Sequence, residues 1–393
     1  MRVLYVSDVY FPRVNGVSTS IRTFRTDLSN CGVDSCLVTP QYDASFVPDE
    51  PEIIRVAGAR VPRDPEDRRM RHGALRRALH ELEDEAFDLV HIHTPFMAHY
   101  AGLNFARRMH IPCIATYHTF FEEYLHHYVP AMPRSAGRWM ARMFTRSQCS
   151  VLDAIVAPSE SMRDALQNYG VTTPLHVVPT GLPASRFKQG DGLRFRSEAG
   201  IAPDRPLLLY VGRVAFEKNI EFLVRMFAAV LTREPSAIFV IAGEGPAQAS
   251  LKGLAAQLGI AESVRFIGYL ERDGSLLDCY AAADTFVFAS RTATQGLVLL
   301  EAMAQGAPVV SIAALGTKSI LTPGCGAVVV PEDIPAFAGA VVTLLHDADR
   351  RTHLSREGRE YAQTWSSIKM AQRLATVYRE LAEYPTIETA DRA

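Results

Sequence analysis

Residues 282–311 read AADTFVFASRTATQGLVLLEAMAQGAPVVS, and this stretch decides the fold. Within it, residues 285–289 are apolar and rich in Phe and Val, which predicts a short buried strand. A polar turn follows and ends at Gly296, and residues 297–305 are good helix formers that stop at Gly306. A strand, a polar glycine loop and a helix in this order are typical of α/β proteins, where the start of the helix offers free backbone N–H groups to a phosphate.

Glu301 lies one turn inside the predicted helix, on the same face as Leu297. A carboxylate at that place can accept hydrogen bonds from two vicinal hydroxyls, such as those of a ribose. The same spacing suits an ordinary amphipathic crossover helix with Glu301 in solvent. Spacing alone leaves both interpretations open.

The whole segment resembles the donor-binding signature of the family-four retaining glycosyltransferases, which have the GT-B fold and use sugar nucleotides. The family motif has two glutamates eight positions apart. The second corresponds to Glu301, and the resemblance implies that it holds the ribose of the nucleotide, beside Gly296, Leu297 and Val298. The first falls on position 293, where this chain has Ala293. The chain therefore keeps the nucleotide half of the motif and lacks the carboxylate that contacts the donor sugar.

Ala293 has two explanations. In the first, the alanine is natural and Thr292, Thr294 or a water takes the place of the carboxylate. In the second, which we favour, the alanine is a change introduced to trap a ligand. With the favoured explanation, we expect slow turnover at this catalytic position and retained nucleotide binding.

Length and composition limit the class of protein. A chain of 393 residues, 48% hydrophobic and 21% charged, is long enough for two domains with substantial cores. A net charge of −2 gives no attraction of the whole molecule to nucleic acid. The six cysteines have no zinc-like spacing and predict reduced thiols of a cytosolic protein. We find neither a secretory signal nor an apolar run of about 18 residues, and so expect a cytoplasmic protein, peripheral at most on the inner face of the plasma membrane.

The loop after the first predicted strand contains the dipeptide Asn15-Gly16. This dipeptide permits positive φ and a close approach of the backbone to a ligand, although a plain strand–helix turn explains it equally well. It resembles the glycine loop of the family, which implies that Gly16 lies where the acceptor meets the donor phosphates.

A predicted strand over residues 112–117 delivers His118 at its carboxyl end, where α/β folds place ligands. His118 would contact a substrate hydroxyl or a pyrophosphate oxygen there, while a lone histidine at a strand end is more often structural. The resemblance implies that His118 is catalytic and lines the cleft between donor and acceptor. It also implies that Tyr117 and Phe120 lie on the acceptor side.

Residues 133–146 place arginines at every fourth position, interleaved with Trp, Met and Phe, and Arg138, Trp139 and Arg142 form the centre of this pattern. A cationic stripe beside an aromatic stripe predicts a helix at a membrane interface. A core-facing helix with arginines at its rim explains nearly the same pattern. Residues 58–79 are also rich in arginine. They suit a basic stretch and helix on anionic headgroups, or a solvated loop followed by a solvated helix face. The sequence over 118–134 resembles the branch of the family that glycosylates diacylglycerol-type lipids.

Potential metal ligands occur in two pairs. Glu123 and His127 have helical spacing but no third partner, so we reject a zinc site. Asp347 and Asp349 lie in a charged segment that is typical of a solvated helix end.

A buried strand predicted at residues 207–212 opens the second half of the chain. The loop after this strand carries Arg213 and Lys218. Two cations five positions apart suit a diphosphate, because Arg binds two oxygens at once and Lys supplies a point charge. A surface pair of Glu217 with Lys218 explains the residues without a ligand. The pattern G-R-x-x-x-E-K-N resembles the family's pyrophosphate motif, so both cations are expected to stabilise the departing nucleoside diphosphate. The resemblance also places Gly243 at a turn beside the phosphates or sugar, and Tyr269 at the strand end that contacts the nucleobase.

Proline and glycine at residues 179–183 mark a domain boundary. We expect an acceptor-binding domain over residues 1–180, completed by a helix at about 366–385, and a nucleotide-sugar domain over 184–364. The alternation of strands and helices in both halves predicts two doubly wound, Rossmann-like α/β domains. The resemblance implies the GT-B fold, in which the domains face a cleft and the last helix crosses back to the first domain.

Taken as a member of this family, the chain is expected to be a retaining hexosyltransferase. It would move a hexose from a nucleoside-diphosphate sugar, with UDP-glucose favoured, to a hydroxyl of a lipid or glycan acceptor such as diacylglycerol. No metal or other cofactor is implied, since the cations are built in. A GDP-mannose-dependent mannosyltransferase and a catalytically inactive nucleotide-sugar-binding protein are the alternatives. A sugar-nucleotide epimerase is disfavoured by Arg213 and Lys218.

Overall fold

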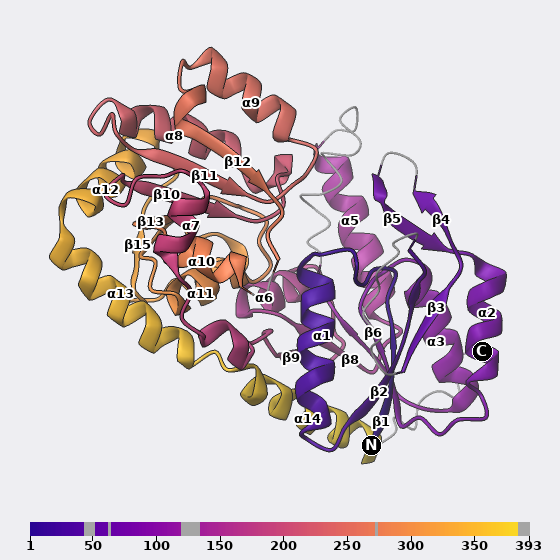
Figure 1. Ribbon diagram of the computed structural model, residues 1–393. Helices are drawn as coiled ribbons and strands as arrows, with labels where there is room; N and C mark the ends of the chain where they lie inside the picture. Colours follow the sequence, from indigo (N-terminus) through magenta and orange to yellow (C-terminus); the bar gives the residue numbers. More distant parts are fainter. Residues whose placement is uncertain (43–51, 62–63, 119–133, 272–273, 384–393) are drawn as a thin grey trace. The chain divides into compact units, whose positions relative to one another are not determined.

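The chain divides into two compact units (Figure 1). The computed structural model describes residues 1–42, 52–61, 64–118, 134–271 and 274–383. Unit 1 comprises Met1–Gly181 and Ser367–Ala393, and unit 2 comprises Leu182–Ser366. Each unit contains a parallel sheet with its own buried apolar core.

Unit 1 is built on a seven-stranded sheet in the order β3-β2-β1-β6-β7-β8-β9. The strands are β1 Arg2–Val6, β2 Asp34–Pro40, β3 Ile53–Val56, β6 Leu89–Ile92, β7 Cys113–Thr116, β8 Ala154–Ala157 and β9 Leu175–Val177. The helices are α1 Gly16–Ser29, α2 His72–Glu81, α3 Met97–Met109, α5 Arg134–Cys149, α6 Glu160–Asn168 and α14 Ser367–Glu383. All neighbouring strands are parallel, and the central ones are buried along their length because helices cover both faces.

Unit 2 is built on a six-stranded sheet in the order β12-β11-β10-β13-β14-β15. The strands are β10 Leu207–Val211, β11 Ile238–Ala242, β12 Val264–Gly268, β13 Thr285–Phe288, β14 Val309–Ser311 and β15 Ala327–Val329. The helices are α7 Gly192–Glu198, α8 Ile220–Leu231, α9 Gln248–Gln257, α10 Ser275–Ala281, α11 Leu297–Ala304, α12 Ile334–His346 and α13 Ala348–Gln363. The strand and helix predicted at 285–289 and 297–305 are β13 and α11, so this prediction is confirmed.

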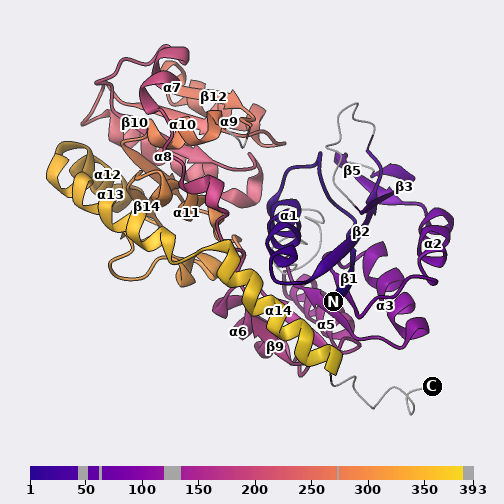
Figure 2. The same cartoon turned by 60° about the horizontal axis from the view of Figure 1, so that its bottom comes forward.

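Both sheets change direction near their middle. In unit 1 the chain moves outward from β1 to β2 and then returns to the other side of β1 at β6; in unit 2 the same reversal separates β10 from β13. Since crossovers between parallel strands are right-handed, the reversal places α1 and α3 on opposite faces of the first sheet, as Figure 2 shows. Loops at the carboxyl ends of the strands beside such a reversal form the ligand-binding crevice of doubly wound folds.

Residues 58–70 differ from the expectation of a loop. They form an antiparallel hairpin of β4 Gly58–Val61 and β5 Asp64–Met70, with Gly58 opposite Met70. Strand β5 (DPEDRRM) consists mostly of charged residues, and β4 (GARV) is very short, so neither shows the alternation of apolar and polar residues by which a strand is recognised. The helical part of this arginine-rich segment is confirmed as α2.

The described chain ends in two helices, α13 and α14, which are separated at Trp365, and α14 lies where a helix was expected at about 366–385. Asp347 caps α13 by accepting a hydrogen bond from the amide of Arg350, as expected of a helix end rather than a metal site. Helix α14 packs in the core of unit 1, where Leu374 and Tyr378 are fully buried. It therefore completes the first domain, as the resemblance implies.

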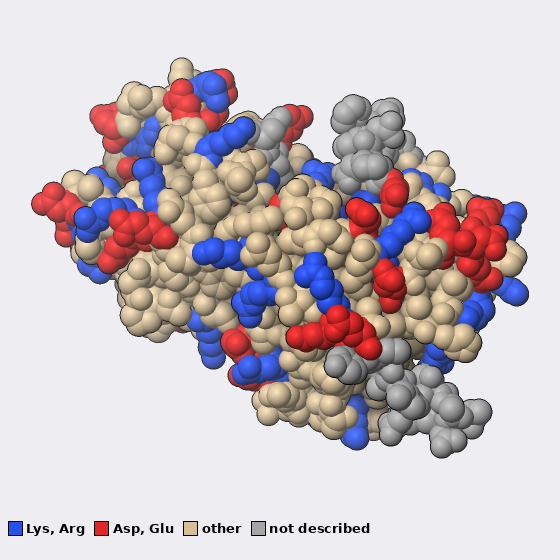
Figure 3. All heavy atoms as spheres, turned by 90° about the horizontal axis from the view of Figure 1, so that it is seen from below, with Lys and Arg blue, Asp and Glu red and all other residues tan. Residues whose placement is uncertain are grey.

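None of the described helices combines the length and the apolar character that a membrane crossing requires. Acidic and basic side chains form small, mixed groups on the face drawn in Figure 3, in keeping with the near-zero net charge.

Candidate active site

The strands of unit 2 bring most of the predicted donor-binding residues to one edge of the sheet. Strands β11, β10 and β13 are parallel neighbours, so their carboxyl ends lie side by side. Arg213 and Lys218 follow β10, Gly243 follows β11, and the polar turn that ends at Gly296 follows β13. This edge includes the reversal between β10 and β13, where a ligand crevice is expected. Tyr269 follows β12, the next strand on the same edge, and is 47% exposed.

Three neighbouring strand ends at this edge are joined by direct backbone contact. The amide of Gly243 donates to the carbonyl of Gly268, and the amide of Val214 donates to the carbonyl of Glu244. A Cβ atom on Gly243 would lie 2.0 Å from the carbonyl oxygen of Gly212, and the φ angle of Gly243 is +135°. Only glycine fits both conditions. Gly243 therefore fixes the distance between the cationic loop and its neighbour.

The cationic loop continues into a short 3₁₀ turn, Phe216–Lys218, before α8 begins. Arg213 and Lys218 are both half-buried. Burial lowers the pKa of Lys218, the neighbouring charge of Glu217 raises it, and that of Arg213 lowers it again. A diphosphate beside the two cations would favour their charged forms, because opposite charges at short range stabilise one another.

The loop after β13 is tied to the cationic loop. The Thr292 hydroxyl donates to the carbonyl of Glu217 at 3.2 Å, and the Asn219 amide group donates to the carbonyl of Ala289 at 3.1 Å. Ala293 is buried, and its carbonyl accepts a hydrogen bond from the amide of Gly316. The loop is thus held against the cationic loop on one side and the turn at Gly316 on the other.

Helix α11 begins directly after Gly296, whose φ angle is +93°. Leu297 and Val298 are the first residues of the helix and are half-buried. The first amides of a helix have no partner within it, and the helix dipole favours negative charge there. The start of α11 can therefore bind an anion next to the cationic loop.

Glu301 is not in solvent. It is 2% exposed, accepts a hydrogen bond from the Tyr280 hydroxyl at 3.0 Å, and lies 3.5 Å from Nε of the buried Arg186. Tyr280 is on α10, and Arg186 is in the turn that follows the domain boundary. Neither partner was recognised from the sequence, because nothing local links them to Glu301. The amphipathic-helix alternative with an exposed Glu301 is wrong, and the ribose role stays a prediction.

In unit 1, the carboxyl end of β6 carries two buried histidines next to the predicted His118. The His91 and His93 rings lie 4.1 Å apart, and the His93 and His118 rings are stacked at 5.5 Å. His93 Nδ1 lies 3.2 Å from His118 Nε2, so the two nitrogens share one hydrogen bond. Of these histidines only His118 was predicted as a site residue; the alternation H-x-H at 91–93 was the available signal for the other two.

A hydroxyl of the last helix extends this cluster. His91 Nδ1 lies 2.6 Å from the Tyr378 hydroxyl on α14, which in turn lies 2.7 Å from the Tyr5 hydroxyl on β1. His91 Nε2 lies 2.7 Å from the hydroxyl of Thr116 at the end of β7. Both nitrogens of His91 are therefore occupied, which holds its ring in one orientation.

Burial keeps these imidazoles neutral. It lowers the pKa of His118 to about 4 and that of His93 well below the ordinary value of 6.5. His99, on α3 beside them, has its pKa lowered to about 4 by the same cause. At neutral pH the cluster can therefore exchange hydrogen bonds with neutral groups but does not attract an anion by charge.

Asp8 joins the first strand to β6. Its carboxylate accepts hydrogen bonds from the Thr94 hydroxyl at 2.8 Å and from the Ala98 amide at the start of α3. Burial raises the pKa of Asp8 to about 6, partly offset by these hydrogen bonds. Asp8 ends a predicted strand, and it too was missed as a site residue.

Gly16 begins α1, and its φ angle is not positive, so the backbone here forms a plain strand–helix turn. Asn15 caps the helix by accepting a hydrogen bond from the amide of Ser18. A Cβ atom on Gly16 would meet no other atom within 4 Å. The open backbone still leaves room for a ligand at this place.

The remaining predicted acceptor residues are only partly described. The Tyr117 hydroxyl lies 2.8 Å from the Thr145 hydroxyl of α5, and Tyr117 is half-buried. Phe120 and the rejected metal pair Glu123 and His127 lie outside the described residues. Among the residues that the structure does describe, no group of three or more His, Cys, Asp or Glu side chains is arranged to hold a metal ion.

Helix α5 has one buried face, made by Gly137, Ala141, Thr145 and Cys149. Gln148 is also buried, and most of the other described positions are exposed, with two stripes among them. An arginine stripe consists of Arg138, Arg142 and Arg146, and an apolar stripe consists of Trp139 (65% exposed), Met140, Met143 and Phe144. The core-facing alternative is therefore wrong for the aromatic stripe, because the large apolar side chains face away from the core.

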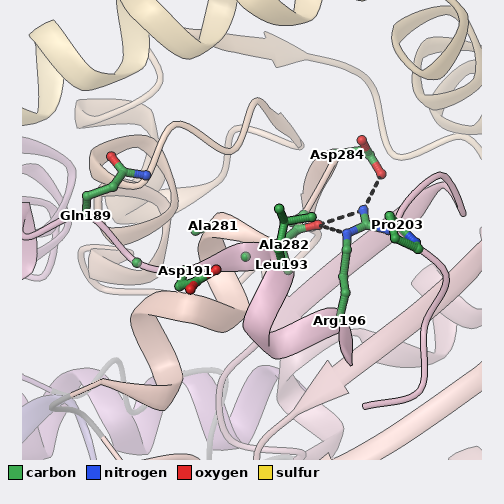
Figure 4. A pocket seen from close by; sticks show the side chains of 11 residues that line it. Gln189, Asp191, Leu193, Arg196, Pro203, Ala281, Ala282 and Asp284 are labelled. Carbon is green, nitrogen blue, oxygen red and sulfur yellow. Dashed lines mark hydrogen bonds and ion pairs between the residues drawn. The ribbon is translucent and has the colours of Figure 1, made fainter. Parts of the chain in front are cut away.

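A further pocket of unit 2, of about 470 Å³, lies at the opposite, amino-terminal end of the strands (Figure 4). Its one buried cation, Arg196, donates to Asp284 and to the carbonyls of Ala282, Ala202 and Arg205. These bonds use all five N–H groups of the guanidinium. Arg196 therefore holds the start of β13 in place and has no donor left for a ligand.

Comparisons with known proteins agree with this arrangement. The family model "Glycosyltransferase Family 4" matches residues 14–186, and "Glycosyl transferases group 1" matches residues 193–361. The chain is 36% identical over 321 residues to the alpha-monoglucosyldiacylglycerol synthase of Streptococcus pneumoniae, covering 79% of this chain and 71% of that protein. It is 28% identical over 364 residues to the GDP-mannose-dependent alpha-mannosyltransferase of Mycobacterium tuberculosis, covering 89% of each.

The fold is shared with solved structures. The Anabaena protein HepE in complex with UDP superposes with a TM-score of 0.76 at 16% identity, covering 97% of this chain and 100% of that chain. A likeness at this identity shows the architecture alone, and it confirms the predicted pair of Rossmann-like domains. With two family models over successive halves and a relative of 36% identity, the chain belongs to glycosyltransferase family 4 and is a hexosyltransferase of the GT-B fold.

Proposed function

We propose that this glycosyltransferase moves glucose from UDP-glucose to a hydroxyl of a lipid such as diacylglycerol, at the surface of an anionic membrane. Binding of the sugar nucleotide is supported by the cationic loop after β10, which packs closely against Gly243, and by the nearby start of α11. The name of the pneumococcal relative supports glucose and diacylglycerol.

Leaving-group stabilisation is the proposed source of catalysis in unit 2. The barrier lies in the departure of the diphosphate while positive charge builds on the sugar. Arg213, Lys218 and the first amides of α11 would stabilise the leaving negative charge without a metal ion. Glu301, held by Tyr280 and Arg186, would orient the ribose and hence the reacting bond. The proposed attack comes from the side of the leaving group, with the departing diphosphate as the base, and so retains the anomeric configuration.

Helix α5 supports the membrane part of the proposal. Its exposed Trp, Met and Phe stripe lies next to an arginine stripe, as on helices that lie in the headgroup region of anionic bilayers. We assign this face to the inner surface of the plasma membrane, with the protein peripheral and cytoplasmic.

The test is transfer of labelled sugar from UDP-glucose or GDP-mannose into phosphatidylglycerol vesicles that contain dioleoylglycerol. Wild type and Ala293→Glu are assayed side by side, because Ala293 lacks the usual carboxylate. We expect a labelled glycolipid from UDP-glucose, formed faster by Ala293→Glu. A product from GDP-mannose alone would select the mannosyltransferase function that the mycobacterial relative carries in its name. Nucleotide binding without a lipid product from either protein would refute the proposed reaction.

A further inference from the structure

Glu332, in the loop between β15 and α12, joins two other loops of unit 2 through its carboxylate. The Asn219 side chain donates to Glu332 Oε1 at 2.8 Å, and Arg291 Nε donates to Glu332 Oε2 at 2.6 Å. Arg291 Nη2 also donates to Oε1, so the guanidinium and the carboxylate form a two-bond contact. Glu332 therefore connects the start of α8 with the loop after β13, in which Arg291 lies two positions before Ala293.

Asn219 directly follows Lys218, and its backbone turns the chain into α8. Its φ angle is +57°, a left-handed conformation that few residues other than glycine adopt. An asparagine at a helix start usually caps its own helix, but the Asn219 side chain makes no such bond. It donates instead to the carbonyl of Ala289 and to Glu332, which uses both N–H groups of its amide. These two contacts hold the turn at Asn219.

The position of the Lys218 ammonium group depends on this turn. The ammonium group has no ion-pair or hydrogen-bond partner among the described residues, although the charges of Glu217 and Arg213 act on it. Lysine carries its charge on a flexible stem. Since no other side chain holds the ammonium group, the backbone at 218–219 determines which positions it can reach.

The contact between Arg291 and Glu332 contributes geometry more than stability. The Arg291 side chain is 64% exposed and that of Glu332 is 25% exposed. Exposed ion pairs add little to the free energy of unfolding, but a two-bond contact between an arginine and a carboxylate fixes their relative orientation. Hydrogen bonding to Arg291 lowers the pKa of Glu332, so the carboxylate is charged at neutral pH.

We propose that Glu332 is a positioning residue for the leaving diphosphate. Through Asn219 it directs the Lys218 ammonium group to the terminal phosphate, and through Arg291 it keeps the loop after β13 beside that group. Glu332 acts through these residues and does not itself contact the nucleotide. The inference rests on the proposed function, because it takes Lys218 as a ligand of the diphosphate.

The test compares nucleoside diphosphates with the monophosphates that lack the terminal phosphate, UDP with UMP and GDP with GMP, by titration calorimetry on the full chain. Wild type is expected to bind one diphosphate about a hundredfold more tightly than its monophosphate, because charge-assisted contacts hold the terminal phosphate. Glu332→Ala should reduce this ratio about tenfold and bind the monophosphate within about twofold of wild type. An unchanged ratio in Glu332→Ala would overturn the positioning role. A wild type that does not prefer either diphosphate would refute the donor site, and the positioning role with it.

Glu234→Ala is the matched control. The Glu234 carboxylate lies 3.0 Å from His346 Nε2 at the end of α12 and accepts a hydrogen bond from the Ser236 hydroxyl. It lies between α8 and β11, at the amino-terminal end of the sheet and away from the cationic loop. We expect Glu234→Ala to leave the ratio of the two affinities unchanged. An equal fall in both variants would mean that a general loosening of unit 2 is responsible, and would contradict the proposal.

Two further variants test whether Arg291 acts through Glu332. Arg291→Gln should reduce the ratio about threefold, less than Glu332→Ala, because Asn219 keeps its bond to the carboxylate. The double variant Arg291→Gln/Glu332→Ala should be no worse than Glu332→Ala alone, since residues in one network do not contribute independently. Losses that multiply in the double variant would show that Arg291 acts on the nucleotide separately, against the proposed route through Glu332.

Discussion

The two strand-end regions of this enzyme have the same topology and opposite electrostatics. In unit 2, the loop after β10 carries two cations beside a helix start, and glycines let its backbone touch the next loop. In unit 1, the loops after β6 and β7 carry histidines that burial keeps neutral, and the glycine at the first helix is open. One region offers positive charge to an anion, and the other offers neutral hydrogen-bonding groups. The position of the site is set by topology, and its ligand class by the charge that the buried environment permits.

The largest expected effect is a difference in the free energy of unfolding between alanine variants of Gly243 and Gly16. Gly243→Ala should lower the free energy of unfolding by about 3 kcal/mol or more, because its Cβ would lie 2.0 Å from a carbonyl oxygen at a φ of +135°. Gly16→Ala should leave the free energy of unfolding unchanged or slightly raised, because no other atom lies within 4 Å of the added Cβ. Urea denaturation of both variants measures the difference. Equal losses would mean that the glycines have the same structural role.

A second prediction concerns the missing carboxylate of unit 2. Ala293→Glu should raise the transfer rate about a hundredfold, the size of one preorganised electrostatic contact near a developing charge. Thr294→Glu is the matched control, since it adds the same charge one position further along the loop. Steady-state rates with UDP-glucose decide the matter. No gain from Ala293→Glu in a folded protein would show that this chain does not use a carboxylate there.

The neutrality of the unit 1 histidines predicts a loss of stability in acid. A histidine with a folded pKa of about 4 and an unfolded pKa of about 6.5 binds protons only in the unfolded state between those values, so stability falls as the pH falls. Removing His99 with His99→Asn should reduce the difference in unfolding free energy between pH 7 and pH 5 by about 2 kcal/mol. The pKa of Asp8 is raised to about 6 in the fold, so Asp8 makes the protein more stable as the pH falls. This contribution is the same in wild type and in His99→Asn and cancels in the comparison. An unchanged difference would show that His99 is protonated in the fold.

The smallest expected effect concerns the surface of α5. Trp139→Ser with Met143→Ser should weaken binding to phosphatidylglycerol vesicles about tenfold, because each removes exposed apolar surface from the proposed membrane face. Leu193→Ser is the control, because Leu193 is 69% exposed but lies on α7 of unit 2. Sedimentation with vesicles measures the bound fraction. Equal binding by all three proteins would remove α5 from the membrane proposal.

Structural features that depend on neighbouring residues in the chain could be predicted from the sequence. The strand, turn and helix over 285–305, the cationic loop and the histidine after β7 were all found from local pattern, because each depends on its neighbours in the chain. The partners of Glu301 and His91 were not. Tyr378 meets His91 across 287 positions, and no periodicity encodes such a contact. The hairpin at 58–70 was missed for a different reason, since a charged strand and a very short one show no apolar alternation.

The central claim is that unit 2 holds a nucleoside diphosphate through the loop after β10. Titration calorimetry of UDP and GDP against wild type and the double variant Arg213→Gln/Lys218→Met tests it most directly. We predict that at least one nucleotide binds wild type and that the double variant binds it about a hundredfold more weakly, because two charge-assisted contacts are lost. Failure of both nucleotides to bind, or binding that is indifferent to the two substitutions, would contradict the account.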